Sequence, residues 1–123
     1  MTSLFKSNQI PFISMSDFKN GSLNVRKPTM VMVYWNDCPH CHDQAPTFVN
    51  HKTKSRFHLT VLDIGDISDA DDDQLRRITR WGYDGSVPTY VMFDSNGKYV
   101  DNYNHAINGG CLKFEYEKMI RQI

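Results

Sequence analysis

The stretch TMVMVYWNDCPHC, residues 29–41, carries the strongest structural signal in the chain. Its first part, Thr29 to Trp35, is nearly all apolar, which is typical of a strand buried at the centre of a sheet. The motif Cys38-Pro39-His40-Cys41 follows, and a predicted helix continues from Cys41 to about Lys54. The sequence therefore predicts that both cysteines lie where a buried strand passes into the first turn of a helix.

This placement favours redox chemistry at the two cysteines. A sulfur at a helix N-terminus faces the positive end of the helix dipole and free backbone N–H groups, which stabilise a thiolate relative to a thiol. Cys38 is predicted to be the more exposed sulfur and the nucleophile, and His40 can place a positive charge or a hydrogen-bond donor beside it. Cys41 is predicted to be the resolving thiol, which attacks a mixed disulfide and releases the reduced substrate.

Outside this stretch, apolar and turn patterns indicate further strands that alternate with helices. Strands are predicted at residues 9–13, 58–64, 89–93 and 98–103, and helices at residues 16–23, 71–81 and 111–120. Ser16 is predicted to cap the first helix, Pro46 to kink the helix after the cysteines, and Asn96-Gly97 to turn a hairpin between the last two strands. The predicted order β-α-β-α-β-α-β-β-α is an α/β fold with a central mixed sheet flanked by helices.

Length and composition indicate one soluble globular domain spanning residues 1–123. The formal net charge is zero, so no long-range field favours nucleic acid or an anionic membrane as a partner. The densest charge run, Asp69 to Asp73, is interpreted as a solvated helix start, with cation binding as the alternative. No apolar run approaches the roughly 20 residues of a membrane helix, and Met1 to Ile13 lacks the apolar core of a signal peptide. We therefore expect a cytoplasmic protein, monomeric by default.

The residues around the motif resemble the thioredoxin superfamily. The shared features are the strand, the pattern W-x-x-C-P-H-C and a proline, Pro46, five residues after the second cysteine. Val87-Pro88-Thr89 is similar to that family's X-Pro-Thr loop, in which the proline is cis and the backbone of the preceding residue pairs with bound substrate. The resemblance covers about residues 9–122. It implies the thioredoxin fold and a cofactor-free protein-disulfide oxidoreductase, with Val87 and Pro88 in the substrate-binding loop.

The dipeptide between the cysteines tunes the redox potential in this superfamily. Pro39-His40 is the pair found in the bacterial disulfide oxidase DsbA, although the chain has no room for the helical insertion of that family. The resemblance therefore implies a potential above the thioredoxin value of about −270 mV, toward the DsbA value of about −120 mV. In a cytosol poised at about −220 mV or lower, such a couple rests mostly reduced and acts as a reductase or isomerase. Glutathione or a thioredoxin reductase would then donate electrons.

The sequence departs from the thioredoxin pattern near the motif. Asp37 directly precedes Cys38, and the negative charge of its carboxylate disfavours the ionised form of a neighbouring thiol. Met32 stands where thioredoxin has a buried acid that handles the proton of the second cysteine, and Asp63 is proposed as the substitute proton acceptor. His105 replaces a glycine that usually lets substrate approach, so it is predicted to contribute to substrate binding.

Other interpretations remain open from the sequence. His40 and His42 are donors for a structural zinc site, but no second Cys or His pair has ligand spacing. The pattern C-x-x-C-H also matches a c-type haem attachment site. A non-enzymatic thioredoxin-fold binding or chaperone-like module is the main alternative to an enzyme. The remaining cysteine, Cys111, is interpreted as a small buried apolar residue, and Trp35 and Trp81 as core residues.

Overall fold

A computed structural model describes residues 4–6, 8–19, 21–50, 57–78 and 87–104. Several sequence predictions fall outside these ranges and are untested by the structure. They are the last helix at 111–120, the proposed substrate residue His105, the core residue Trp81 and the third cysteine, Cys111.

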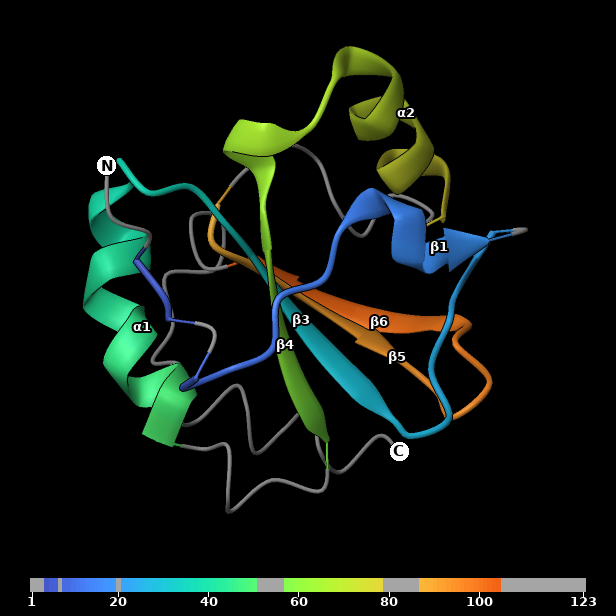
Figure 1. Ribbon diagram of the computed structural model, residues 1–123, viewed down its shortest axis with the longest axis horizontal. Helices are drawn as coiled ribbons and strands as arrows, with labels where there is room; N and C mark the ends of the chain where they lie inside the picture. The colour runs from blue at the N-terminus through green and yellow to red at the C-terminus, as the bar shows by residue number, and fades with distance from the viewer. Residues whose placement is uncertain (1–3, 7, 20, 51–56, 79–86, 105–123) are drawn as a thin grey trace.

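The centre of the fold is a four-stranded mixed sheet (Figure 1). Its strands in spatial order are β4 (His58–Asp63), β3 (Thr29–Tyr34), β5 (Thr89–Phe93) and β6 (Tyr99–Asn104). β3 runs parallel to β4 and antiparallel to β5, and β5 runs antiparallel to β6. The mixed sheet that the sequence predicted is therefore confirmed.

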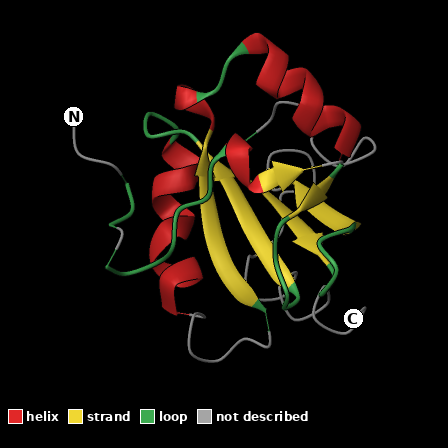
Figure 2. Cartoon of the chain, turned by 45° about the vertical axis from the view of Figure 1, so that its right-hand side comes forward, coloured by secondary structure: helices red, strands yellow, loops and turns green. Residues whose placement is uncertain are grey.

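The two faces of the sheet are covered by different helices, α1 (Pro39–Asn50) and α2 (Asp69–Ile78). Successive side chains of a strand point to opposite faces, so Met30, Met32 and Tyr34 of β3 pack in the same core as α1. Val31 and Val33 of the same strand pack in the second core, together with Leu75 and Ile78 of α2. Every residue of β3 is buried, as its continuous apolar sequence predicts. Figure 2 shows the helices on either side of the strands.

α1 begins directly after Cys38, with Pro39 as its first residue. Proline is favoured at this position because its fixed φ suits the helix and its missing N–H would be unpaired there anyway. The buried side chains of α1 fall on one stripe at helical spacing: Cys41, Gln44, Ala45 and Phe48. The helix continues through Pro46 to Asn50, so this proline does not end it.

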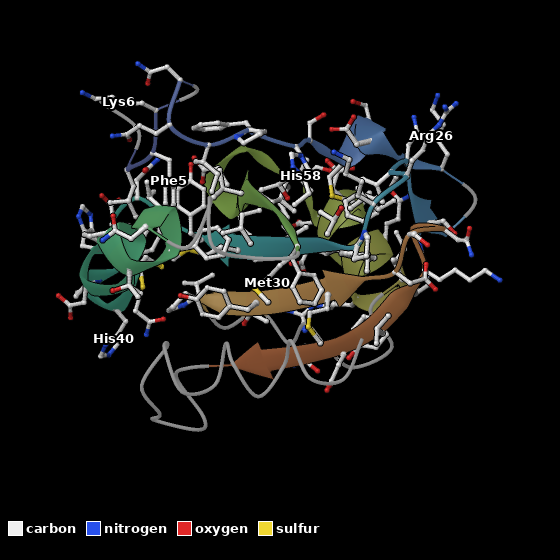
Figure 3. The ribbon with its side chains drawn as sticks, turned by 90° about the horizontal axis from the view of Figure 1, so that it is seen from below. Phe5, Lys6, Arg26, Met30, His40 and His58 are labelled. Carbon is white, nitrogen blue, oxygen red and sulfur yellow. The ribbon has the colours of Figure 1, made fainter. Side chains whose placement is uncertain are left out.

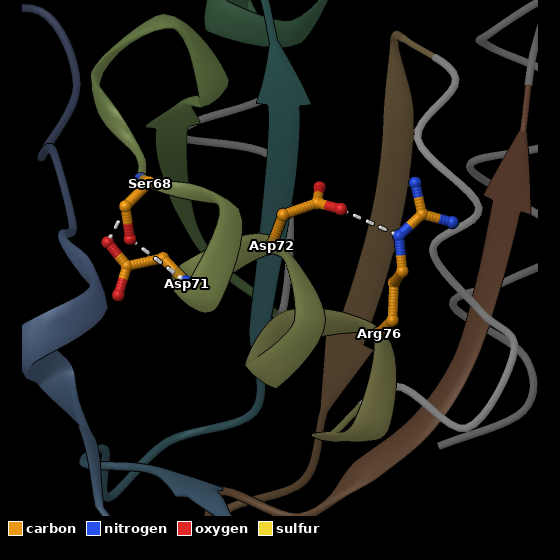
Figure 4. A network of polar contacts seen from close by, with 4 residues as sticks. All are labelled: Ser68, Asp71, Asp72 and Arg76. Atoms are coloured by element: carbon orange, nitrogen blue, oxygen red, sulfur yellow. Dashed lines mark hydrogen bonds and ion pairs between the residues drawn. The ribbon is translucent and has the colours of Figure 1, made fainter.

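The acidic run Asp69 to Asp73 forms the start of α2, which is capped by Ser68 (Figure 4). The Asp71 N–H donates to Ser68 Oγ at 3.1 Å, and the Ser68 N–H donates to the Asp71 carboxylate at 3.2 Å, which is a capping box. One turn later, Arg76 Nε lies 2.8 Å from a carboxylate oxygen of Asp72. The interpretation of Asp69 to Asp73 as a solvated helix start is confirmed.

The predicted helix at residues 16–23 is wrong. The chain forms a 3₁₀ turn, η1 (Met15–Asp17), followed by two short antiparallel strands, β1 (Phe18–Lys19) and β2 (Ser22–Leu23). Gly21 has a φ of 78°, a left-handed conformation that breaks a helix and suits a tight turn. The dipeptide Asn20-Gly21 is a hairpin signal that outweighs the capping potential of Ser16.

Of the strand predicted at residues 9–13, only Phe12 pairs with the sheet. Phe12 forms a single parallel bridge with Val61 of β4, and the remainder of this segment is irregular. Nearer the N-terminus, Phe5 is buried and its ring packs edge-on against Tyr34, with centroids 4.9 Å apart. The N-terminal segment therefore lies against the core that contains Cys38 and Cys41.

Candidate active site

Cys38 occupies the position just before α1, and its sulfur caps the helix. The Cys41 N–H donates to Cys38 Sγ at 3.3 Å, in the way an ordinary N-cap side chain accepts from the third helical residue. The Cys38 N–H donates to the Trp35 carbonyl at 3.1 Å, which closes the turn between β3 and α1. A backbone N–H at the positive end of the helix is an electrostatic partner for a thiolate. Both cysteines are free thiols, and Cys38, 7% exposed against 0% for Cys41, is the more exposed as predicted.

The loop before β5 meets the first cysteine. Cys38 Sγ lies 3.6 Å from the Val87 carbonyl oxygen, although 49 residues separate them in the chain. The Val87–Pro88 peptide bond is cis, Pro88 is buried and Val87 is half-buried. The structure therefore brings together the motif and the Val-Pro loop that sequence analysis had joined only by resemblance.

The environment of Cys41 favours its protonated form. Burial raises the pKa of the Cys41 thiol to about 12, and a hydrogen bond and negative charge from Cys38 add to the effect. Backbone N–H groups, including that of Trp35, partly oppose the shift. Charge on Cys38 disappears when that sulfur enters a disulfide. The part of the raised pKa of Cys41 that comes from Cys38 is therefore absent once Cys38 is in a disulfide.

The raised pKa of Cys41 predicts how stability depends on pH. The ordinary value is 9.0 and the folded value about 12, so this thiol contributes stability that is present below pH 9 and lost as pH rises toward 12. Between pH 8 and pH 10, reduced wild type should lose about 1 kcal/mol more unfolding free energy than a Cys41→Ser variant. Urea denaturation of both proteins at the two pH values measures this difference. Equal losses in the two proteins would contradict it.

Asp63 lies near the motif but makes structural hydrogen bonds. At the end of β4, its Oδ1 accepts from the Gly65 N–H at 2.8 Å and caps the 3₁₀ turn η2 (Ile64–Asp66). Its Oδ2 accepts from Asn36 Nδ2 at 3.0 Å. Among the described contacts, no hydrogen bond joins Asp63 to Cys41. Its role as a proton acceptor therefore stays a prediction.

The histidines of the motif differ in placement. His40 is exposed, and Figure 3 shows its side chain pointing outward from α1. His42 Nε2 forms a 2.5 Å hydrogen bond with the Asn36 carbonyl oxygen. Since a carbonyl oxygen only accepts, this ring nitrogen carries the hydrogen. The sequence indicates His42 only as a candidate metal ligand, and the contact with Asn36 is visible only in the structure. The one sequence signal for Asn36 is its place as a polar residue between a buried strand and the motif.

The prediction that Trp35 is a core residue is wrong. Its side chain is 45% exposed, because β3 ends at Tyr34 and the chain leaves the sheet before Trp35. A Cβ placed at Gly65 would lie 3.4 Å from Trp35 Cδ1, so the indole lies beside η2. An exposed tryptophan three residues before Cys38 adds a large apolar surface next to the motif. Among the other predicted site residues, Pro39 and Asp37 are exposed and Met32 is fully buried.

The described residues show neither a metal centre nor a membrane-spanning helix. No group of three or more His, Cys, Asp or Glu side chains in this part of the chain is arranged to hold a metal ion. None of the helices described here is long and apolar enough to cross a bilayer.

The fold of the chain is similar to that of solved thioredoxin structures. Mitochondrial thioredoxin 3 of Saccharomyces cerevisiae, in its oxidized form, is 13% identical and superposes with a TM-score of 0.65 over 94% of this chain and 97% of that one. Thioredoxin f from spinach chloroplast is 16% identical, with a TM-score of 0.62 over 89% of this chain and 88% of that one. The fold is that of thioredoxin.

A third thioredoxin structure is also similar, whereas comparisons of sequence alone find no match. Fasciola hepatica thioredoxin is 16% identical, with a TM-score of 0.59 over 80% of this chain and 83% of that one. No protein-family model matches the sequence, and comparison with curated proteins finds no match. At these identities the thioredoxin fold is what the similarity shows, and the chemistry must be argued from the chain's own residues.

Proposed function

We propose that this protein is a thiol–disulfide oxidoreductase that exchanges disulfides with protein substrates through Cys38 and Cys41. The observation that carries the proposal is the helix-capping sulfur: Cys38 Sγ accepts the Cys41 N–H at the N-terminus of α1, in a thioredoxin fold. This position stabilises developing negative charge on one sulfur while the second sulfur stays protonated and buried. The asymmetry supports one nucleophile and one resolving thiol.

The reaction proceeds in two exchanges. The Cys38 thiolate attacks one sulfur of a substrate disulfide, the substrate S–S bond breaks, and the other substrate sulfur leaves as a thiolate that takes up a proton. Cys41 then loses its proton and attacks Cys38 Sγ. The Cys38–Cys41 disulfide forms, and the second substrate sulfur leaves and is protonated. In total, two electrons pass from the protein to the substrate, and of the two protons taken up by the substrate thiols one balances the proton lost by Cys41 and the other comes from solvent.

The surface around Cys38 is suited to a polypeptide substrate. The Val87 carbonyl lies beside the sulfur, so an extended substrate segment placed there pairs with the backbone of this loop. Trp35 contributes exposed apolar area on the preceding turn. Tryptophan is enriched among the residues that dominate the energy of protein interfaces. Val87, Pro88 and Trp35 are therefore the proposed substrate-contacting residues.

The proposal includes a redox potential above that of thioredoxin, because Pro39-His40 separates the cysteines and the capping N–H favours the reduced form. A dithiol with such a potential is kept reduced by glutathione or by a thioredoxin reductase. In the cytoplasm the protein then works as a monomeric reductase or isomerase. Two molecules of glutathione supply the two electrons that return the Cys38–Cys41 disulfide to the dithiol.

Equilibration with glutathione tests this proposal. The fraction of the Cys38–Cys41 disulfide is measured by alkylation and mass spectrometry across a series of reduced-to-oxidised glutathione ratios, with a Cys111→Ser variant as the control for the third cysteine. A potential clearly above about −270 mV is expected. A value at or below that level contradicts the oxidising character, whereas failure to form the disulfide at any ratio contradicts the function itself.

A further inference from the structure

Three separate segments of the chain converge on Asn36. The Leu4 N–H donates to Asn36 Oδ1 at 2.7 Å, and Asn36 Nδ2 donates to Asp63 Oδ2 at 3.0 Å. The Asn36 carbonyl oxygen accepts from His42 Nε2. One half-buried residue thus connects the N-terminal segment, the end of β4 and the first turn of α1.

Asn36 also lies inside the turn that carries Cys38. The hydrogen bond from the Cys38 N–H to the Trp35 carbonyl encloses Asn36 and Asp37 as the central residues of this turn. Tyr34 and Asp63 are partners in the parallel register of β3 and β4, so these strands end at the same edge of the sheet. This alignment places the Asp63 carboxylate within reach of the amide two residues beyond Tyr34.

We propose that Asn36 is a positioning residue that fixes the turn before Cys38 and thereby holds its sulfur over the N-terminus of α1. This inference rests on the proposed function and deepens it. Cys38 Sγ must stay near the Cys41 N–H, 3.3 Å away, for the helix terminus to stabilise its thiolate. Hydrogen bonds weaken steeply as distance and angle depart from their optimum. Three hydrogen bonds of Asn36 hold the turn and so keep the distance between Cys38 Sγ and the Cys41 N–H constant. In a turn without them, this distance would vary.

The proposal assigns no proton transfer to Asn36. Its carboxamide is neutral and does not titrate, so it acts on Cys38 through position and not through charge. The Asp63 carboxylate is the fixed acceptor that orients the amide, and the Leu4 N–H is the fixed donor on the opposite side. An N-terminal segment anchored by buried Phe5 therefore becomes part of the support of the active site.

An Asn36→Ala variant is the first test, with Asn24→Ala at an exposed loop position as its matched control. Loss of the side-chain hydrogen bonds should shift the glutathione equilibrium about three- to tenfold toward the disulfide, the range that such bonds are worth. The rate of Cys38 alkylation by iodoacetamide at pH 7, followed by mass spectrometry of the Cys38 peptide, should fall by about the same factor. The control should match wild type in both measurements.

A second pair of variants tests the N-terminal anchor without touching the turn. Leu4→Pro removes the backbone N–H that Asn36 Oδ1 accepts, because proline has no N–H. Leu4→Ala keeps that N–H and removes most of the side chain. The proline variant should shift the glutathione equilibrium by about twofold or more, and the alanine variant should not. This pair decides the question if Asn36→Ala does not fold.

The readouts separate positioning from simple stability. A merely structural Asn36 would lower the free energy of unfolding and leave the glutathione equilibrium and the rate of Cys38 alkylation at pH 7 unchanged. Values within twofold of wild type for Asn36→Ala, or equal effects of the two Leu4 substitutions, would overturn the inference. If wild type itself forms no Cys38–Cys41 disulfide with glutathione, the proposed function fails first, and that failure is recognised before any variant is measured.

Discussion

Replacing Cys38 with serine should reduce the rate of insulin disulfide reduction by about 1,000-fold or more, because a neutral hydroxyl is a far weaker nucleophile than a thiolate. The capping geometry at α1 is retained in this variant, since a serine oxygen also accepts the Cys41 N–H. Activity is followed by the turbidity of reduced insulin with dithiothreitol as electron donor. Circular dichroism of the variant shows whether its fold is unchanged.

Replacing Cys41 gives the complementary result. A Cys41→Ser variant keeps the nucleophile and lacks the thiol that releases the substrate, so the mixed disulfide with Cys38 should accumulate. Mass spectrometry of the intact protein detects this adduct, and a structure of it should show the substrate backbone beside the Val87 carbonyl. If Cys38→Ser keeps both activity and partner binding, the cysteines are not the active centre. If it binds partners and wild type has no activity, the non-enzymatic module is the better description.

Replacing Gly97 with alanine should lower the free energy of unfolding by about 3 to 5 kcal/mol, because the new Cβ would clash with the backbone of another strand. Gly97 has a φ of 80°, and its carbonyl accepts the Leu23 N–H at 2.8 Å. A Cβ at this position would lie 1.7 Å from the Leu23 carbonyl oxygen. The contact is between two backbones, so no side-chain rotation relieves it.

Gly21 is the matched control for this substitution. It has a similar φ of 78°, but a Cβ there meets nothing within 4 Å. Gly21→Ala should therefore cost only the conformational strain, about 1 kcal/mol. Urea denaturation of the two variants separates the effect of strain from that of the close approach. A Gly97→Ala variant no less stable than Gly21→Ala would disprove the steric explanation.

The turn at Gly97 illustrates how far sequence reasoning reaches. Asn96-Gly97 between two apolar runs predicts a hairpin, and β5 and β6 form it. The close approach of Leu23 depends on β2, a strand that sequence analysis misread as the end of a helix. The type of a turn depends on adjacent residues and can be predicted from them. The segment that packs against the turn is distant in the sequence and cannot be predicted in this way. Trp35 shows the same limit, because its exposure depends on where β3 leaves the sheet.

By itself, the sequence determined the alternation of strands and helices from β3 to β6, the position of both cysteines at a strand-to-helix junction, and the acidic start of α2. Each of these depends on residues close together in the chain, where hydrophobic period and capping act directly. Only the tertiary structure decided that the Val87 carbonyl faces Cys38 and that Leu4, Asp63 and His42 meet at Asn36. These contacts join segments separated by up to 49 residues. Their geometry is set by strand register and helix packing, which no local pattern encodes.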